Sequence, residues 1–276
     1  MHFQGISQRL SVVLITAATI GACYASTLRG MAAQWWNDED MSHGFAVPIV
    51  ILWIIWRERD RWRGLQAQPS AWGFALMAAA AALQLAGVLG VGLFAGSVAF
   101  LVSIAGAVLC LGGFAWLRAL GFPLILAVFM LPKLAIVYNQ LTLPLQLLAS
   151  RIAAGMLTIA GVGVLREGNI LDVGGHRIAV VEACSGLRYL LSLGFMALVF
   201  AYLTDSKAWM RLALLAAAIP VAILANAARV AAAGWSPSLD VGVAHAVVGG
   251  LMFAICLVAL VLLRQVFNNL YVRYQS

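Results

Sequence analysis

The chain has 276 residues, of which 64% are hydrophobic and 10% are charged, and its mean hydropathy is +0.99. A soluble domain carries about 25% charged residues, so this chain has too little polar surface to fold as a globule in water. Its net charge of +7 lies in short basic clusters between apolar runs, which is typical of membrane loops and not of a groove that binds nucleic acid. We therefore expect an integral membrane protein in contact with lipids and without a nucleic-acid partner.

Eight apolar runs approach the length of about 20 residues that a helix needs to cross a bilayer. They cover residues 9–28, 42–57, 71–90, 93–113, 120–138, 185–203, 211–229 and 245–264. No low-complexity tract or internal repeat interrupts them. We therefore predict an all-α polytopic membrane protein with about eight transmembrane helices, folded as a single integral-membrane domain over residues 1–276.

The distribution of basic residues orients these spans. With a cytoplasmic N-terminus, the inner loops carry ten Lys and Arg residues and the outer segments carry six. The basic cluster from Arg57 to Arg63 contributes most to this difference. Because inner loops are enriched in Lys and Arg, both termini are predicted to be cytoplasmic.

The segment between the fifth and sixth spans, residues 139–183, is then expected on the extracytoplasmic side. Its first half is apolar but contains Pro144 and Arg151, which favours an interfacial or re-entrant helix over a full crossing. Its second half alternates in polarity around the Gly-Gly pair at 174–175, which predicts a small β-hairpin. This hairpin would lead directly to Cys184.

The four cysteines are widely spaced and form no C-x-x-C pair. Three of them, Cys23, Cys110 and Cys256, lie inside apolar runs, where a cysteine usually packs as a small hydrophobic residue. The sequence therefore predicts no zinc site, no disulfide framework and no cofactor. Cys184 is the cysteine placed for chemistry.

Cys184, Arg229 and His245 fall at the predicted outer ends of the sixth, seventh and eighth spans, so span parity brings them to one membrane level. Only a thiolate is a good nucleophile, and a nearby cation or a helix N-terminus favours it over the thiol. Arg229 could supply that cation or stabilise the oxyanion of a tetrahedral intermediate. His245 could exchange a proton with the thiol or with a leaving amine. The three residues together predict a thiol-dependent acyl-transfer site.

Each of these residues also has a structural explanation when it is taken alone. A cysteine in an apolar protein usually packs, an arginine at a helix end usually anchors the helix at the interface, and a lone interfacial histidine is often structural. A transporter or channel with Arg229 and His245 in its outer vestibule is the main alternative, and a non-catalytic scaffold subunit is another. Transporters usually place polar groups near the bilayer midplane and contain inverted repeats. No such repeat is found here, which favours the enzyme.

Three neighbours of the predicted site are expected to support it. Gly186 would leave room for a substrate backbone, and Ser185 could present its N–H or hydroxyl group there. Asn226 lies one helical turn before Arg229 and is expected to orient it or to satisfy backbone groups.

Two further residues, Arg188 and His43, have more than one explanation that remains open. Arg188 lies one turn after Cys184, where it could tune the thiolate, bind a substrate carboxylate, or form a structural ion pair with Glu182. His43, at the outer start of the second span, could line an entrance to the site or simply cap its helix.

Four strings in this sequence resemble the exosortase and archaeosortase family of membrane transpeptidases. The similarity runs in a consistent order from about Trp35 to Phe253, and the strings are specific in combination although each is short. They are SHGFAVPIVILWIIWRER from Ser42, EACSGLRYL from Glu182, NAARV from Asn226 and AHAVVGG from Ala244.

The resemblance implies that Cys184 is the nucleophile and that Arg229 and His245 complete the site. It implies substrates that are exported proteins with a C-terminal sorting signal of the PEP-CTERM type: a Pro-Glu-Pro-like motif, a hydrophobic helix and a basic tail. It also implies a bacterial inner membrane, an active site at the periplasmic face and an association with exopolysaccharide. The acceptor nucleophile, and the choice between transfer and hydrolysis, stay open.

Overall fold

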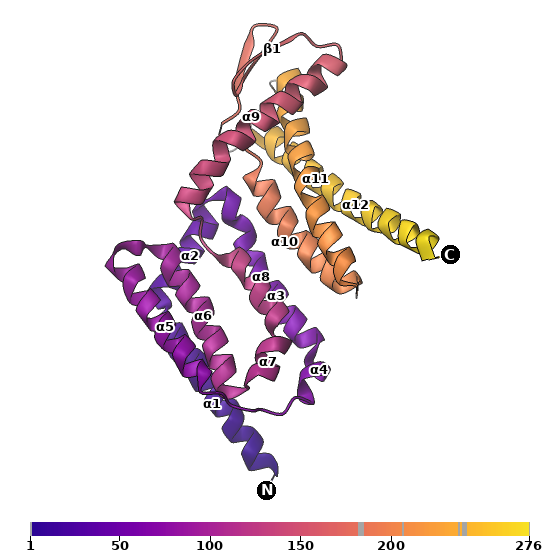
Figure 1. The fold of residues 1–276 in the computed structure, drawn as a ribbon. Helices are drawn as coiled ribbons and strands as arrows, with labels where there is room; N and C mark the ends of the chain where they lie inside the picture. Colours follow the sequence, from indigo (N-terminus) through magenta and orange to yellow (C-terminus); the bar gives the residue numbers. More distant parts are fainter. Residues whose placement is uncertain (1, 182–184, 206, 237, 239–241, 276) are drawn as a thin grey trace. The chain divides into compact units, whose positions relative to one another are not determined.

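The computed structural model describes residues 2–181, 185–205, 207–236, 238 and 242–275, and it describes their side chains except at 2–10, 63, 91, 242–246 and 275. The chain forms two compact units, an N-terminal unit of residues 1–134 and a C-terminal unit of residues 135–276. Figure 1 shows the helices and strands of each unit.

The N-terminal unit consists of helices in the described residues. Its α-helices and its short 3-10 or π segments (η) are α1 (His2–Cys23), α2 (Ala25–Asn37), η1 (Glu39–Phe45), α3 (Ala46–Arg57), α4 (Arg59–Arg63), α5 (Trp72–Ala86), η2 (Gly87–Val91), α6 (Leu93–Leu111), α7 (Phe114–Ala119), α8 (Gly121–Ala127) and η3 (Val128–Met130).

The C-terminal unit combines four long helices with a small sheet. Its elements are α9 (Ala135–Ile159), β1 (Val164–Glu167), β2 (Ile170–Val173), β3 (His176–Ala179), α10 (Leu187–Thr204), α11 (Ala208–Trp235) and α12 (Gly242–Gln275).

Seven helices in the described part of the chain are long and apolar enough to cross a membrane, and there are eight if the bent pair α1–α2 forms one span. The prediction of an all-α polytopic membrane protein is therefore confirmed. The first predicted span differs in detail, because the chain bends by 70° between Ser11–Cys23 and Ala25–Asn37. Residues 9–28 are thus not one straight helix.

The fifth predicted span, residues 120–138, is not a continuous helix either. Helical structure ends at Met130, and Leu131 adopts an extended conformation (φ −65°, ψ 139°) before Pro132. Proline disfavours the helical conformation of the residue before it, which explains the break. α8 lies alongside α3, and η3 contacts η1, so this short-helix segment still runs back along α3 (Figure 1).

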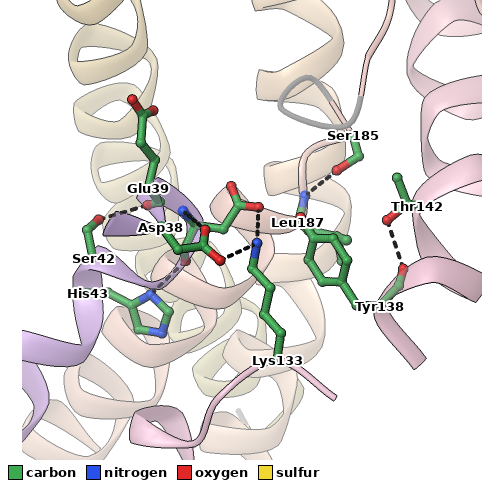
Figure 2. A network of polar contacts seen from close by, with 10 residues as sticks. Asp38, Glu39, Ser42, His43, Lys133, Tyr138, Thr142, Ser185 and Leu187 are labelled. Carbon is green, nitrogen blue, oxygen red and sulfur yellow. Dashed lines mark hydrogen bonds and ion pairs between the residues drawn. The ribbon is translucent and has the colours of Figure 1, made fainter. Parts of the chain in front are cut away.

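A cluster of three charged residues joins η1 to the segment that follows η3. The Nζ atom of Lys133 lies 2.8 Å from Oδ2 of Asp38 and 2.8 Å from Oδ2 of Asp40 (Figure 2). Beside it, Trp35 donates a hydrogen bond from Nε1 to the carbonyl of Met130 (3.1 Å). We call Asp38, Asp40 and Lys133 the Lys133 clasp, because they tie η1 to the segment that follows η3.

In the C-terminal unit, α11 is the central helix. It packs against α9, α10 and α12. Its core contacts use small residues such as Ala218 and Ala222, against Leu193 and Leu260 of its neighbours. Small side chains let helix backbones approach closely, and this close approach replaces the hydrophobic effect as the source of packing energy between helices in lipid.

The sheet confirms the predicted hairpin and adds a strand to it. β2 and β3 pair in antiparallel register, with Val173 opposite His176 across the two-residue turn at 174–175. Both turn glycines have positive φ (61° and 87°), which a two-residue hairpin turn of this kind requires. β1, which pairs with the other edge of β2, was not predicted. Each strand has four residues, and β1 is joined to β2 by the two-residue turn Gly168-Asn169, a hairpin signal that the prediction did not use.

The helix predicted to lie at the interface is α9, which has 25 residues and a mean hydropathy sufficient for a span. It contains Pro144 as predicted, and it is continuous across this proline. Its interfacial position, and the extracytoplasmic position of the sheet, stay predictions.

Breaking the Lys133 clasp should destabilise the protein. Lys133, Asp38 and Asp40 have side-chain exposures of 15%, 27% and 13%, so replacing Lys133 by Met leaves two poorly solvated carboxylates side by side. We expect Lys133→Met to cost about 2 kcal/mol, measured by thermal unfolding in detergent.

Arg61→Met is the matched control. Arg61 pairs with Glu58 at 3.3 Å but is 62% exposed, and such pairs contribute less than about 0.5 kcal/mol. Equal losses in the two variants would contradict a structural role for the clasp.

Candidate active site

The predicted catalytic residues belong to the C-terminal unit. Cys184 and the supporting residue Glu182 lie outside the described residues. His245 lies in the first turns of α12, where the backbone is described and the side chain is not. The geometry of the site therefore comes from Arg229, Asn226 and the residues on either side of Cys184.

Immediately after Cys184, the chain is packed against α11. Ser185 is buried, and its Oγ accepts a hydrogen bond from the backbone N–H of Leu187 (3.4 Å), at the start of α10 (Figure 2). Gly186 has φ +88°, and a Cβ atom at this position would lie 3.0 Å from Cγ and Nδ2 of Asn226. Only glycine combines this backbone conformation with so close an approach. Gly186 is thus needed to seat the N-terminus of α10 on Asn226.

The chain that leads toward Cys184 is fixed at Val180. The backbone N–H of Val180 donates to the carbonyl of Asn169 (2.8 Å), and Asn169 donates from Nδ2 back to the carbonyl of Val180 (3.1 Å). Val180 is buried in a cluster with Leu171 of β2, Ala149 of α9 and Val230 of α11. The sheet is therefore docked on α11 by the residue next to Arg229.

Arg229 lies between these two anchor points on α11. Val180 contacts the cluster that includes Val230, and Gly186 contacts Asn226, so the anchors lie four residues apart on one helix. Four helical residues span about 6 Å. Val180 and Gly186 are thus both held against the turn of α11 that carries Arg229.

The guanidinium of Arg229 is held inside the unit. Arg229 is only 7% exposed, and its Cζ lies 5.9 Å from the ring centroid of Tyr189 in α10. Tyr189 in turn donates a hydrogen bond from its hydroxyl to the carbonyl of Gly249 in α12 (3.2 Å). A guanidinium beside the N-terminus of α10 is a group of the kind that can stabilise a thiolate or an oxyanion.

Two other predicted supporting residues, Arg188 and Asn226, lie in α10 and α11. Arg188 lies in the first turn of α10 and is partly buried, and its predicted pairing with Glu182 falls outside the described residues. Asn226 is buried and lies against Gly186, and its role in orienting Arg229 or satisfying backbone groups stays a prediction.

His43 belongs to the N-terminal unit. It lies in η1, with Nδ1 3.1 Å from the carbonyl of Asp40, whose carboxylate is part of the Lys133 clasp (Figure 2). This contact is with a carbonyl three residues earlier, and the N-cap residue of α3, Phe45, makes no side-chain cap hydrogen bond, so the capping role and the entrance role both stay predictions.

Sequence reasoning did not single out Tyr189 and Asn169. Tyr189 stands inside the EACSGLRYL string, and a polar aromatic residue in an apolar helix is a signal that its hydroxyl has a partner. Asn169 precedes the strand β2 and resembles an ordinary turn residue. Its bonds to Val180 depend on strand pairing, which local sequence does not reveal.

Comparison with known proteins gives the family. A family model described as Transmembrane exosortase (Exosortase_EpsH) matches residues 35–262, well over half of the chain. No curated protein and no solved structure gives a significant match. The matched range contains the sheet, the segment around Cys184, the α11 turn with Arg229 and the first turns of α12. This chain belongs to the transmembrane exosortase family.

Proposed function

We propose that this protein is a membrane-embedded cysteine protease and transpeptidase that cleaves C-terminal sorting signals of the PEP-CTERM type from exported proteins. One observation carries this proposal beyond family membership. The chain on both sides of Cys184 is anchored to the turn of α11 that holds the buried guanidinium of Arg229. A fixed cation beside a cysteine favours its thiolate, and the thiolate is the nucleophilic form.

The reaction begins when the Cys184 thiolate attacks the carbonyl carbon of the scissile peptide bond. A C–S bond forms, and the carbonyl electron pair moves onto oxygen, where Arg229 stabilises the oxyanion. Collapse of this intermediate breaks the C–N bond, and His245 gives its proton to the leaving amine. The enzyme then carries a thioester, and the severed signal leaves with a free amino group.

The second half of the reaction releases the product. An acceptor amine or water attacks the thioester, its proton passes to His245, and the C–S bond breaks to restore the thiolate. We infer transfer to an acceptor as the main outcome, because a thioester persists long enough to react with an acceptor amine.

The substrate is held by its own C-terminal hydrophobic helix in this proposal. The positive-inside distribution supports cytoplasmic termini and a site at the periplasmic face of a bacterial inner membrane. The substrate helix then docks laterally, and the motif before it reaches Cys184 at the membrane surface.

Co-expression with an exported reporter that carries a candidate sorting signal tests this function. The expected result is a reporter with a new C-terminus before the hydrophobic helix, identified by mass spectrometry of the intact protein. A reporter that keeps its full-length C-terminus with every candidate signal would refute the proposed activity.

Replacing the nucleophile should abolish processing without unfolding the protein. We expect Cys184→Ala to accumulate full-length reporter, because no other group can form the thioester, while its thermal unfolding stays close to that of the wild type. Cys23→Ala is the control, since Cys23 is an exposed cysteine of the N-terminal unit, and it should process normally. Normal processing by Cys184→Ala would end the nucleophile assignment.

Gly186→Ala should slow processing by more than the strain of positive φ alone would. A Cβ atom there would press on the Asn226 side chain at 3.0 Å in addition to the strain of positive φ. We expect processing to fall at least about tenfold, which corresponds to 1.4 kcal/mol in the transition state.

Gly161→Ala is the control that introduces the strain of positive φ without a contact like the one with Asn226. Gly161 has a similar φ of +80°, and a Cβ atom there would meet nothing within 4 Å. The strain alone costs about 1–2 kcal/mol of stability and should leave the processing rate per folded molecule unchanged. Similar processing by the two variants would show that contact with Asn226 is unimportant.

A further inference from the structure

Tyr189 connects the three helices that carry the site. It lies in α10 and is 5% exposed. Its ring faces Arg229 of α11, with Cζ 5.9 Å from the ring centroid, and its hydroxyl donates to the carbonyl of Gly249 in α12 at 3.2 Å. These two contacts join the side chain of Tyr189 to two other helices, α11 and α12.

The contact with α12 bears on His245. Gly249 follows His245 by four residues, so the two positions lie on the same face of α12, one turn apart. A Cβ atom at Gly249 would lie 3.7 Å from the Tyr189 hydroxyl, an ordinary van der Waals contact, so the approach does not require glycine at this position. A hydrogen bond at this point fixes the rotation and the height of α12 relative to α10.

The contact with α11 bears on Arg229. An arginine side chain has many rotamers, and a buried one needs neighbours that select a single orientation. The face of an aromatic ring attracts a guanidinium and excludes water from one side of it. The ring of Tyr189 therefore restricts where the guanidinium of Arg229 can point.

We propose that Tyr189 is the positioning residue of the active site: its ring orients Arg229, and its hydroxyl sets the register of α12 and hence of His245. The proposal rests on the proposed function of these two residues. Tyr189 does not touch the reacting atoms in this account. It acts through two residues that do.

Packing alone is the competing explanation. Tyr189 also belongs to a core cluster with Leu193, Ala197, Ala222 and Leu260, so its loss would destabilise the unit in any case. The two explanations differ in what happens to folded molecules. A packing role lowers only the folded fraction, whereas a positioning role also changes the chemistry of the molecules that stay folded.

The experiment compares three variants of the full chain. Tyr189→Phe keeps the ring and removes the bond to Gly249, and Tyr189→Leu removes both contacts. Tyr24→Phe is the matched control in the N-terminal unit, because Tyr24 is also 5% exposed and loses an equivalent hydroxyl contact, to Oγ of Ser103 at 2.7 Å. Each variant is made with Cys23→Ser, Cys110→Ala and Cys256→Ala, so that Cys184 is the remaining thiol.

Two readouts are normalised to folded protein: the pH profile of Cys184 alkylation by iodoacetamide, and the rate of reporter processing. We expect Tyr189→Phe to leave the alkylation profile in place and to slow processing about tenfold, the effect of one lost hydrogen bond. We expect Tyr189→Leu to move the alkylation midpoint to higher pH and to slow processing about a hundredfold. Tyr24→Phe should match the parent protein in both.

Two results would overturn the proposal. One is that Tyr189→Leu keeps the parental alkylation profile and processing rate per folded molecule. The other is that Tyr24→Phe slows processing as much as Tyr189→Phe. Failure of the proposed function is recognised separately, because it would appear as processing that survives Cys184→Ala, whereas the alkylation profile reports on the surroundings of Cys184 without any substrate.

Discussion

The arrangement of the C-terminal unit depends on one constraint: the chain is attached to one turn of α11 both before and after Cys184. Before Cys184, Val180 is held by Asn169 and packs in the cluster with Val230. After it, Gly186 lies against Asn226 in a conformation and at a distance that only glycine accepts. Arg229 lies between Asn226 and Val230 on the same helix, and its guanidinium is buried. The described residues that flank Cys184 are thus attached to the turn of α11 that carries Arg229.

Polar groups are costly in hydrocarbon, so a charged side chain in a membrane protein is usually buried among other residues or placed near the interface. Arg229 is buried in the C-terminal unit. The small sheet pairs its backbone groups between strands and docks on α9 and α11 through Leu171 and Val180. In the N-terminal unit, the Lys133 clasp joins η1 to the segment after η3 by charge pairing.

Much of this fold could be predicted from hydropathy, because long apolar runs have few alternatives to helices in a bilayer. The predictions failed where local chemistry interrupts a run: at the bend around Tyr24, and at Leu131, where Pro132 ends helical structure. The turn at 174–175 was predictable because two adjacent glycines suit its positive φ values, and β1 was missed although the Gly168-Asn169 pair is also a two-residue turn signal, with Gly168 at φ 63°. For the site, span parity predicted that Cys184, Arg229 and His245 lie at one membrane level, which stays a prediction, and the predicted end of the seventh span at Arg229 was wrong because α11 continues to Trp235. The contacts of Tyr189 and Asn169 could not be predicted, since they depend on helix rotation and strand register.

Trapping the acyl-enzyme tests the central claim most directly. The purified full-length protein is mixed with a substrate that carries the sorting signal, quenched in acid after one turnover, and digested for mass spectrometry. The account predicts that the peptide containing Cys184 gains the mass of the substrate's acyl portion and loses it on treatment with hydroxylamine, which cleaves thioesters. Cleavage of the substrate with an unmodified Cys184 peptide throughout the time course, or with the adduct on another residue, would contradict it.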